Sequence, residues 1–324
     1  MAPDQAQLAR FATDLDQLVS AGERIGIAVS GGADSLALLL LGAAARPGLV
    51  EAVTVDHALR PDSKAEADFV GHFCSSRGVP HKIMTVEWGE RPTAAIQERA
   101  RQERYRLIGQ WMIDQKLQLV CTGHHRDDQA ETLLMRLARG VGLSGLAAIR
   151  PVSALPGSSG LTLVRPLLNW RRHELAEICA AADVGPIDDP SNADPRFERA
   201  RVRRHIAQLG INAGALGRSA DHLRAADEAI EWAVDQEWMA RVRHAEDGMT
   251  YSPGDAPREI RRRIVARLIT ALATEGAPDL RGRELDRLLD TLELSSVATL
   301  RGVRAQGGRS WRFTAASPRT LVSG

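Results

Sequence analysis

The chain has 324 residues, of which 44% are hydrophobic and 26% are charged, and its formal net charge is +1. This composition is typical of a globular protein and excludes an intrinsically disordered chain. No apolar run reaches the roughly 18 to 20 residues of a membrane span, and acids stand where a signal peptide would be basic. We therefore expect a cytoplasmic protein without membrane association, and its length predicts one large and one smaller domain.

Short apolar runs alternate with helical patterns through the first half of the chain. We predict strands over 25–30, 50–55, 82–86 and 117–122, and helices over 34–45, 63–77, 93–115 and 126–138. The order strand then helix, repeated, favours a parallel sheet covered on both faces. The predicted fold class is therefore α/β with a doubly wound parallel sheet, which continues through 161–168 and a helix over 171–183 to the turn-rich segment 184–195.

The second part of the chain is predicted to be smaller and mostly helical. After an arginine-rich helix near 197–206, helices are predicted over 213–242, 257–273 and 282–293, and short strands near 297–303 and 310–315. We place the domain boundary after residue 210, which gives domains 1–210 and 211–324. Residues 1–195 have 20 basic and 24 acidic side chains, whereas 196–324 have 22 and 17, so the basic surplus lies in the second part.

The segment between the first strand and the first helix is rich in glycine, hydroxyl and carboxylate groups: Ser30, Gly31, Gly32, Ala33, Asp34 and Ser35. In a doubly wound sheet, ligands bind at the carboxyl ends of the strands, where a helix N-terminus offers free N–H groups to an anion. Asp34 is either a helix cap or a ligand for Mg²⁺. By themselves these residues fit a phosphate-binding loop and an ordinary capped turn equally well.

Histidine and acidic side chains also cluster after the fourth predicted strand. His124 precedes a helix whose first turns contain Asp127, Asp128 and Glu131. Acids at a helix N-terminus suit its dipole and can also hold a cation. Zinc is disfavoured because neither a cysteine nor a further histidine stands at ligand spacing. The three cysteines are far apart in the chain, which favours small buried residues over a disulfide framework: Cys74, Cys121 and Cys179.

Four segments, in the correct order, resemble a known family. Residues 30–35 resemble the SGGxDS loop of the PP-loop ATP pyrophosphatase superfamily, and residues 53–63 resemble its second element. Residues 121–149 resemble the GHHxDDxAET and RGxGxxGLxx signature of the tRNA(Ile)-lysidine synthetase family, and the VRPLL segment with Arg165 follows it. Residues 188–204 resemble that family's DxSNxxxxxRNxxR element, except that Ala200 stands where Asn is usual.

The resemblance implies an ATP-dependent ligase that forms a C–N bond between free L-lysine and carbon 2 of a cytidine. That cytidine is the first anticodon residue of tRNA(Ile) with anticodon CAU, and the reaction passes through an adenylated tRNA. The implied cofactors are ATP and Mg²⁺, and the implied metal ligands are Asp34 and Asp128. The ATP-binding residues would be Ser30, Gly31, Gly32, Ala33, Asp34, Ser35, Asp56 and His57, although a plain strand end is the alternative for the last two.

The catalytic candidates that the resemblance implies are Asp34, His124, Asp128, Glu131, Arg199 and Arg201. A lysine amine must lose a proton before it attacks, because its reference pKa is about 10.4. The proton acceptor is left open among His124, Asp128 and Glu131.

Two arginine clusters are candidates for contact with tRNA, with solvated helix faces as the alternative. The first is Arg196, Arg199, Arg201, Arg203 and Arg204, and the second is Arg258, Arg261, Arg262, Arg263 and Arg267. Trp232 and Trp238 are expected in a core. The alternative functions are another PP-loop tRNA-modifying enzyme such as a thiolase, which the lack of a CxxC pair disfavours, and a silent nucleotide-binding module. The sequence leaves the oligomeric state open and is compatible with a homodimer.

Overall fold

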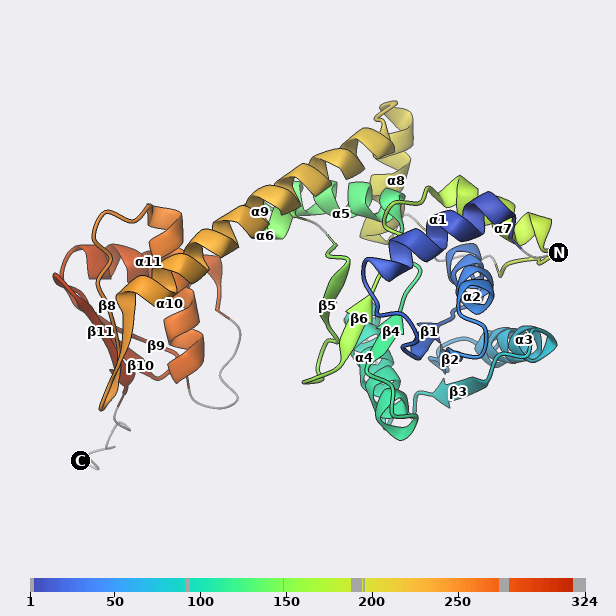
Figure 1. The fold of residues 1–324 in the computed structure, drawn as a ribbon, viewed down its shortest axis with the longest axis horizontal. Helices are drawn as coiled ribbons and strands as arrows, with labels where there is room; N and C mark the ends of the chain where they lie inside the picture. The colour runs from blue at the N-terminus through green and yellow to red at the C-terminus, as the bar shows by residue number, and fades with distance from the viewer. Residues whose placement is uncertain are drawn as a thin grey trace. The chain divides into compact units, whose positions relative to one another are not determined.

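The computed structural model describes residues 3–90, 94–147, 149–187, 194, 196–273 and 280–316 (Figure 1). The chain divides into two compact units, Met1–Arg224 and Ala225–Gly324. The division falls within helix α9 (Ala213–Arg241), later than the boundary predicted after residue 210. Much of the predicted element 188–204, namely 188–193 and 195, lies outside the described residues. In the described part of the chain, no helix has the length and hydrophobicity needed to cross a bilayer.

The first unit contains a six-stranded sheet in the order β3-β2-β1-β4-β6-β5. Its strands are β1 (Ile25–Ala28), β2 (Val50–Asp56), β3 (His81–Thr85), β4 (Leu119–Cys121), β5 (Val152–Ala154) and β6 (Thr162–Val164). All neighbours pair in parallel except the edge strand β5, which is antiparallel to β6. The predicted doubly wound α/β sheet is confirmed, and β5 is an addition that is too short to show a hydrophobic pattern.

Helices cover both faces of this sheet. They are α1 (Gln5–Asp16), α2 (Ala33–Ala45), α3 (Ser63–Ser76), α4 (Ile96–Asp114), α5 (Arg126–Ala138), α6 (Leu143–Leu146), α7 (Arg172–Ala181) and α8 (Glu198–Gln208). Along β1, Ile25 and Ile27 join a core with α1, α2, α3 and α7, whereas the alternate residue Ala28 faces the core formed with α4. This period-2 alternation is what a sheet covered on both faces requires.

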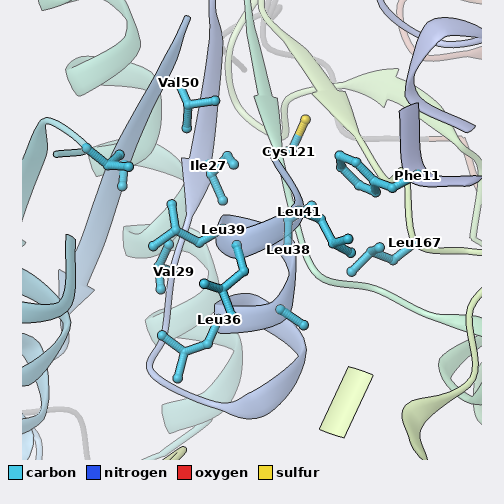
Figure 2. Close-up of a cluster of buried hydrophobic side chains, with 14 of the residues drawn as sticks. Phe11, Ile27, Val29, Leu36, Leu38, Leu39, Leu41, Val50, Cys121 and Leu167 are labelled. Atoms are coloured by element: carbon cyan, nitrogen blue, oxygen red, sulfur yellow. The ribbon is translucent and has the colours of Figure 1, made fainter. Parts of the chain in front are cut away.

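Helix α2 is apolar on nearly every side because it lies between the sheet and other helices. Leu36, Leu39 and Leu41 are buried against residues of the sheet and of α1 (Figure 2). Burying each such side chain contributes about 2 kcal/mol. The packing fixes the first turn of α2 and thereby the position of the loop at residues 30–35.

The second unit combines helices with an antiparallel sheet in the order β7-β8-β11-β10-β9. The strands are β7 (Val242–Ala245), β8 (Gly248–Tyr251), β9 (Val297–Leu300), β10 (Val303–Gln306) and β11 (Trp311–Ala315), and the helices are the end of α9, α10 (Arg258–Leu272) and α11 (Gly282–Glu293). The strands predicted near 297–303 and 310–315 are confirmed, whereas β7 and β8 were not predicted. Trp238 packs against this unit's core as expected, but Trp232 is 66% exposed and the core expectation for it was wrong.

Candidate active site

The loop at residues 30–35 has a conformation that its glycines make possible. Gly31 has a φ of 84°, in the left-handed region, and a Cβ atom on it would lie 2.4 Å from Cδ1 of Ile187. The N–H of Ile187 donates to the carbonyl oxygen of Gly31 over 2.9 Å. The Oγ of Ser35 accepts from the N–H of Ser30 and donates to the carbonyl of Gly32, at 3.1 and 3.0 Å. The loop is therefore held in shape by the protein itself.

Asp34 does not act as a helix cap. The N-cap of α2 is Gly32, without any side-chain capping bond, and Asp34 is the second residue of the helix. Its Oδ1 atom is buried and has no hydrogen-bond partner among the described residues, whereas Oδ2 lies 3.4 Å from Nε2 of His125. A buried carboxylate oxygen without a partner favours a ligand at this position.

Residues 124 to 128 bring a second carboxylate to the same place. His125 is the N-cap of α5, and its N–H donates to Oδ2 of Asp128 over 3.0 Å. Nε2 of His125 lies 3.6 Å from that same oxygen, so the ring stands between Asp34 and Asp128. Burial opposes a charge on His125, but the hydrogen bond with Asp34 and the charges of Asp128, Asp34 and Asp127 outweigh it and raise the pKa of His125.

The two members of the histidine pair have opposite electrostatic surroundings. Burial lowers the pKa of His124 to about 4, with Arg165 and Arg199 acting in the same direction and Asp128 against it. Its Nδ1 is 2.9 Å from Oγ1 of Thr122. His124 is therefore neutral at pH 7. Sequence reasoning singled out His124 as the candidate residue and missed His125, whose ring lies between the two carboxylates.

These groups line a cavity of about 660 Å³ at the carboxyl ends of β1, β2 and β4. Its volume is in the range of ligand pockets, and its position is where ligands bind in doubly wound sheets. The predicted residues that line it are Ser30, Gly32, Asp34, Ser35, Asp56, His57, His124, Asp128 and Arg199. Gly31 and Ala33 belong to the same loop but are not part of the lining.

Two other predicted residues lie away from the cavity lining. Glu131 is 2% exposed, and its Oε1 accepts from Nε of Arg203 in α8 over 2.6 Å. Arg201 is exposed, and its Nη1 donates to the carbonyl of Arg196 over 2.9 Å. Within the described structure neither Glu131 nor Arg201 lines the cavity. Their catalytic roles remain predictions.

The end of β2 contributes polar groups to the other side of the cavity. Oδ1 of Asp56 accepts from the N–H of Ala58 over 2.8 Å, which shapes the turn after the strand. Nδ1 of His57 is buried without a hydrogen-bond partner in the described residues. Burial and then the charge of Arg104 lower the pKa of His57 to about 4, against the effect of Asp56. A neutral imidazole with an unused nitrogen is suited to bind a nucleotide's polar edge.

Sequence reasoning missed two further residues of this site. Arg104 of α4 lines the cavity and has no hydrogen bond or ion pair within the described part of the chain; burial lowers its pKa, and Tyr105 opposes this effect. An arginine in an arginine-rich helix gives no signal of its own. A Cβ atom on Gly123 would lie 2.9 Å from the carbonyl oxygen of Asp34, so only glycine lets the two chain segments approach this closely.

The two carboxylates fit Mg²⁺. This ion is usually held by one or two carboxylates together with phosphate oxygens and water. The described residues contain no group of three metal-binding side chains, so phosphate oxygens of a bound nucleotide would have to complete the coordination by Asp34 and Asp128. The unpartnered Oδ1 of Asp34 is available for such a bond.

A glycine-rich loop before α2, with two carboxylates at the carboxyl edge of a parallel sheet, is the arrangement expected of an ATP-utilising enzyme of the PP-loop class. The family described as PP-loop domain matches residues 3–209. Among solved structures, the U34-tRNA thiolase NcsA from Methanococcus maripaludis, with its 4Fe-4S cluster, shares the fold with a TM-score of 0.57 and 17% identity, over 68% of this chain and 77% of that one.

Curated relatives define the family more closely. The tRNA(Ile)-lysidine synthase of Zymomonas mobilis subsp. mobilis is 44% identical over 91% of this chain and 89% of its own length. That of Novosphingobium aromaticivorans is 42% identical, over 95% and 93%. The chain belongs to the tRNA(Ile)-lysidine synthase family.

Proposed function

We propose that this chain joins free L-lysine to carbon 2 of the first anticodon cytidine of tRNA(Ile) with anticodon CAU. Oxygen 2 of the cytosine attacks the α-phosphate of ATP and releases pyrophosphate; the lysine ε-amine then attacks carbon 2, loses a proton and expels AMP. The observation that carries this proposal is one cavity lined by the phosphate loop, two carboxylates and His124. Family membership, with identities of 44% and 42% to the two relatives, supports it.

In the first step, the chain's own contribution is to bind and orient the phosphates. The N–H groups at the start of α2 and the hydroxyls of Ser30 and Ser35 face the anion, and Arg104 and Arg199 add positive charge to the cavity wall. When held by Asp34 and Asp128, Mg²⁺ neutralises charge that develops on the leaving pyrophosphate.

In the second step, a group in the cavity must accept the proton of the lysine ammonium. We propose Nε2 of His124, which lines the cavity, as the acceptor in the tautomer whose Nδ1–H donates to Oγ1 of Thr122; burial lowers its pKa to about 4, so the ring is a weak base and the transfer is uphill. Asp128 stays ionised: burial opposes its charge, but His125, His124 and Arg199 lower its pKa. It is therefore suited to attract the ammonium rather than to take its proton.

A sulfur transfer of the thiolase kind is the alternative chemistry, and the cysteines do not favour it. All three are buried, and burial raises the pKa of Cys74 and of Cys121 to about 12 and that of Cys179 to about 11. A sulfur carrier needs an accessible thiolate.

We further propose residues 1–210 as the catalytic domain and 211–324 as the tRNA-binding domain. The reaction is expected in the cytoplasm, where ATP, lysine and tRNA meet. A homodimer remains a prediction that light scattering of the purified protein would test.

The test is transfer of radiolabelled lysine to tRNA(Ile) with anticodon CAU by the purified protein with ATP and Mg²⁺. The methionine tRNA with the same anticodon bases is the control. We expect label in the isoleucine tRNA alone. Release of pyrophosphate without label would keep the adenylylation step and reject lysine as the nucleophile.

Asp34→Ala provides the first prediction for a variant. It removes the buried carboxylate oxygen that we assign to the metal, so pyrophosphate release should fall by about a thousandfold or more. Binding of tRNA, measured by filter retention, should change by less than about threefold because Asp34 lies within the nucleotide cavity. Full activity of this variant would reject the proposal that Asp34 and its loop bind the phosphates and the metal ion of ATP.

A further inference from the structure

The arginines of α10, which the sequence suggested for tRNA, are neutralised within the second unit. Each one pairs with a carboxylate: Arg258 with Asp290 and Glu293, Arg261 with Glu293, Arg262 with Asp286, Arg263 with Asp227, and Arg267 with Glu231 and Asp235. A phosphate would have to compete with acids already in place. Basic and acidic side chains are equal in number in this unit, so a surface that binds phosphate must be one on which the arginines are separated from the acids.

The sheet of the second unit has one face of a different character. Helices α10 and α11 contact β11 and β9 (Figure 1), and on the face that forms the core lie Tyr251, Trp311, Phe313, Val303 and Ala305. The strand register places the alternate residues on the opposite face. Across the five strands one row is Arg243, Thr250, Arg312, Gln306 and Val297, and the next row is Ala245, Gly248, Thr314, Arg304 and Thr299.

This face, which we call the open sheet face, is polar and basic. Arg243, Arg304 and Arg312 are exposed, and no position of the two rows is a carboxylate. The guanidinium of Arg243 donates to backbone carbonyls, and Arg304 donates to the amide oxygen of Gln306, with no acid paired to either side chain in the described residues. Arg312 pairs with Asp247 of the β7–β8 hairpin at 2.8 Å, so at this one position a phosphate would have to compete with an acid, as it would at the similarly exposed pair of Arg258 with Asp290.

The β7–β8 hairpin holds two acids, Glu246 and Asp247, but the sequence that forms β9, β10 and β11 holds none. After Glu293 the chain has five arginines and no aspartate or glutamate as far as its last residue. One of these arginines, Arg309, lies exposed in the turn between β10 and β11 and has no hydrogen bond or ion pair in the described residues. Guanidinium groups with hydroxyl and amide groups between them are what a nucleic-acid backbone requires.

We propose that the open sheet face of the second unit, and not helix α10, binds the phosphate backbone of the substrate tRNA. The contacts are made by Arg304, Arg309 and Arg312, with Arg243 beside them and the threonine hydroxyls between the arginines. This inference rests on the proposed function for the identity of the RNA. It assigns no reading of bases to this face, since arginine contacts to phosphates position an RNA without reading its sequence.

The test compares two triple variants of the full-length protein that lose the same charge. The face variant is Arg304→Gln, Arg309→Gln and Arg312→Gln, and the matched control is Arg258→Gln, Arg262→Gln and Arg267→Gln. Binding of tRNA(Ile) is measured without ATP or lysine at several salt concentrations. We expect the Kd of the face variant to rise about tenfold and its salt slope to fall by about 2, since each phosphate contact contributes roughly 0.7 to 0.9 to the slope.

The control variant should bind tRNA within about twofold of the unchanged protein, and thermal unfolding should show that both variants are folded. Equal weakening in both variants would overturn the inference, because net charge alone would then explain it. Unchanged binding by the face variant would also overturn it. A face variant that loses binding to anionic phospholipid vesicles but still binds tRNA would overturn the inference as well. Because no step of lysidine formation is measured, failure of the proposed reaction and failure of this surface are separate results.

Discussion

At the scale of single residues, two neighbouring carboxylates in the helix-start sequence have different tasks. Asp127 accepts hydrogen bonds from the side chain of Arg171 and from the N–H of Arg172, and so ties α5 to α7. Asp128 faces the cavity, 3.5 Å from Nη1 of Arg199. Successive residues of a helix point about 100° apart. The sequence shows that both acids begin the helix, but only the packing of α7 decides which one reaches the ligand.

Asp128 and Glu131 are predicted to fail in different ways when their charge is removed. Asp128→Asn should lose most lysine incorporation, about a thousandfold, with little change in thermal stability, since it lines the cavity. Glu131→Gln leaves Arg203 without its buried partner and should cost about 2 kcal/mol of stability, while the folded protein keeps its activity within about tenfold. Unfolding curves and single-turnover rates of both variants check this. A stable, inactive Glu131→Gln protein would restore Glu131 as a candidate base.

Gly123 gives a prediction that depends on one contact. In Gly123→Ala, the new Cβ atom would lie 2.9 Å from the backbone oxygen of Asp34, so β4 and the start of α2 must move apart. We expect a loss of about 1 to 3 kcal/mol in stability and a weaker affinity for ATP, measured by calorimetry. The matched control is Gly89→Ala, where no atom lies within 4 Å of the added group. An unchanged ATP affinity in Gly123→Ala would contradict this account.

At the scale of elements, sequence periodicity was sufficient to predict the helices and strands in the first part of the first unit. The strands and helices from β1 to α5 lie within a few residues of their predicted places, because each is bounded by turns and buried on a regular face. Strand β6 lies within the predicted segment 161–168, whereas the three-residue edge strand β5 was not predicted. The end of α9 lies within one residue of its predicted place, but the hairpin of β7 and β8 that follows has only four residues in each strand and was not predicted.

The candidate site was predictable only where its residues follow one another in the chain. The loop from Ser30 to Ser35 and the pair His124 and Asp128 carry their signal in short motifs, and they do line the cavity, apart from Gly31 and Ala33. Arg104 comes from the middle of α4 and reaches the site through tertiary packing alone. The same cause hides the ion pairs of the α10 arginines, since most of their acidic partners lie on other helices; the predicted contact of these arginines with tRNA stays a prediction.

The junction of α1 and α7 yields a prediction for the pH dependence of stability. Glu174 accepts from Arg10 and from the N–H of Arg171, both over 2.6 Å. Although burial raises it, these hydrogen bonds and the charge of Arg10 hold the pKa of Glu174 below its ordinary value of 4.5. A depressed carboxyl pKa stabilises the fold above the ordinary pKa, and this stabilisation disappears as the pH falls through the lower, folded value.

Glu174→Gln should therefore be less stable than the unchanged protein by about 1 kcal/mol at pH 7. The difference should shrink as the pH falls below 4.5 and vanish once the folded carboxyl is protonated. Urea unfolding of both proteins between pH 7 and pH 3 measures it. A stability difference between the two proteins that grows toward acid pH would contradict the lowered pKa of Glu174 in the folded protein.

At the scale of the whole molecule, each of the two units has its own hydrophobic core. The core residues of the first unit surround the six-stranded sheet, whereas those of the second surround the five-stranded sheet. The second unit also contains a buried charge cluster, in which Arg263, 6% exposed, contacts Asp227, Glu231 and Glu259. The nucleotide cavity, in contrast, is lined entirely by residues of the first unit.

This separation predicts which unfolding transition each perturbation moves. ATP with Mg²⁺ at about 100 times its Kd should stabilise the first unit by about 2.7 kcal/mol and raise its transition in a calorimetric scan. Arg263→Ala removes the ion pair of the buried Asp227 with Arg263 and should destabilise the second unit by about 3 kcal/mol, because breaking a buried ion pair by removing one partner is costly. The shift produced by ATP should be the same in this variant, and Arg267→Ala, which breaks a more exposed pair, should have a smaller effect. If Arg263→Ala removed the ATP-induced shift, the two cores would have to unfold as one cooperative structure. Nucleotide binding would then stabilise both units together.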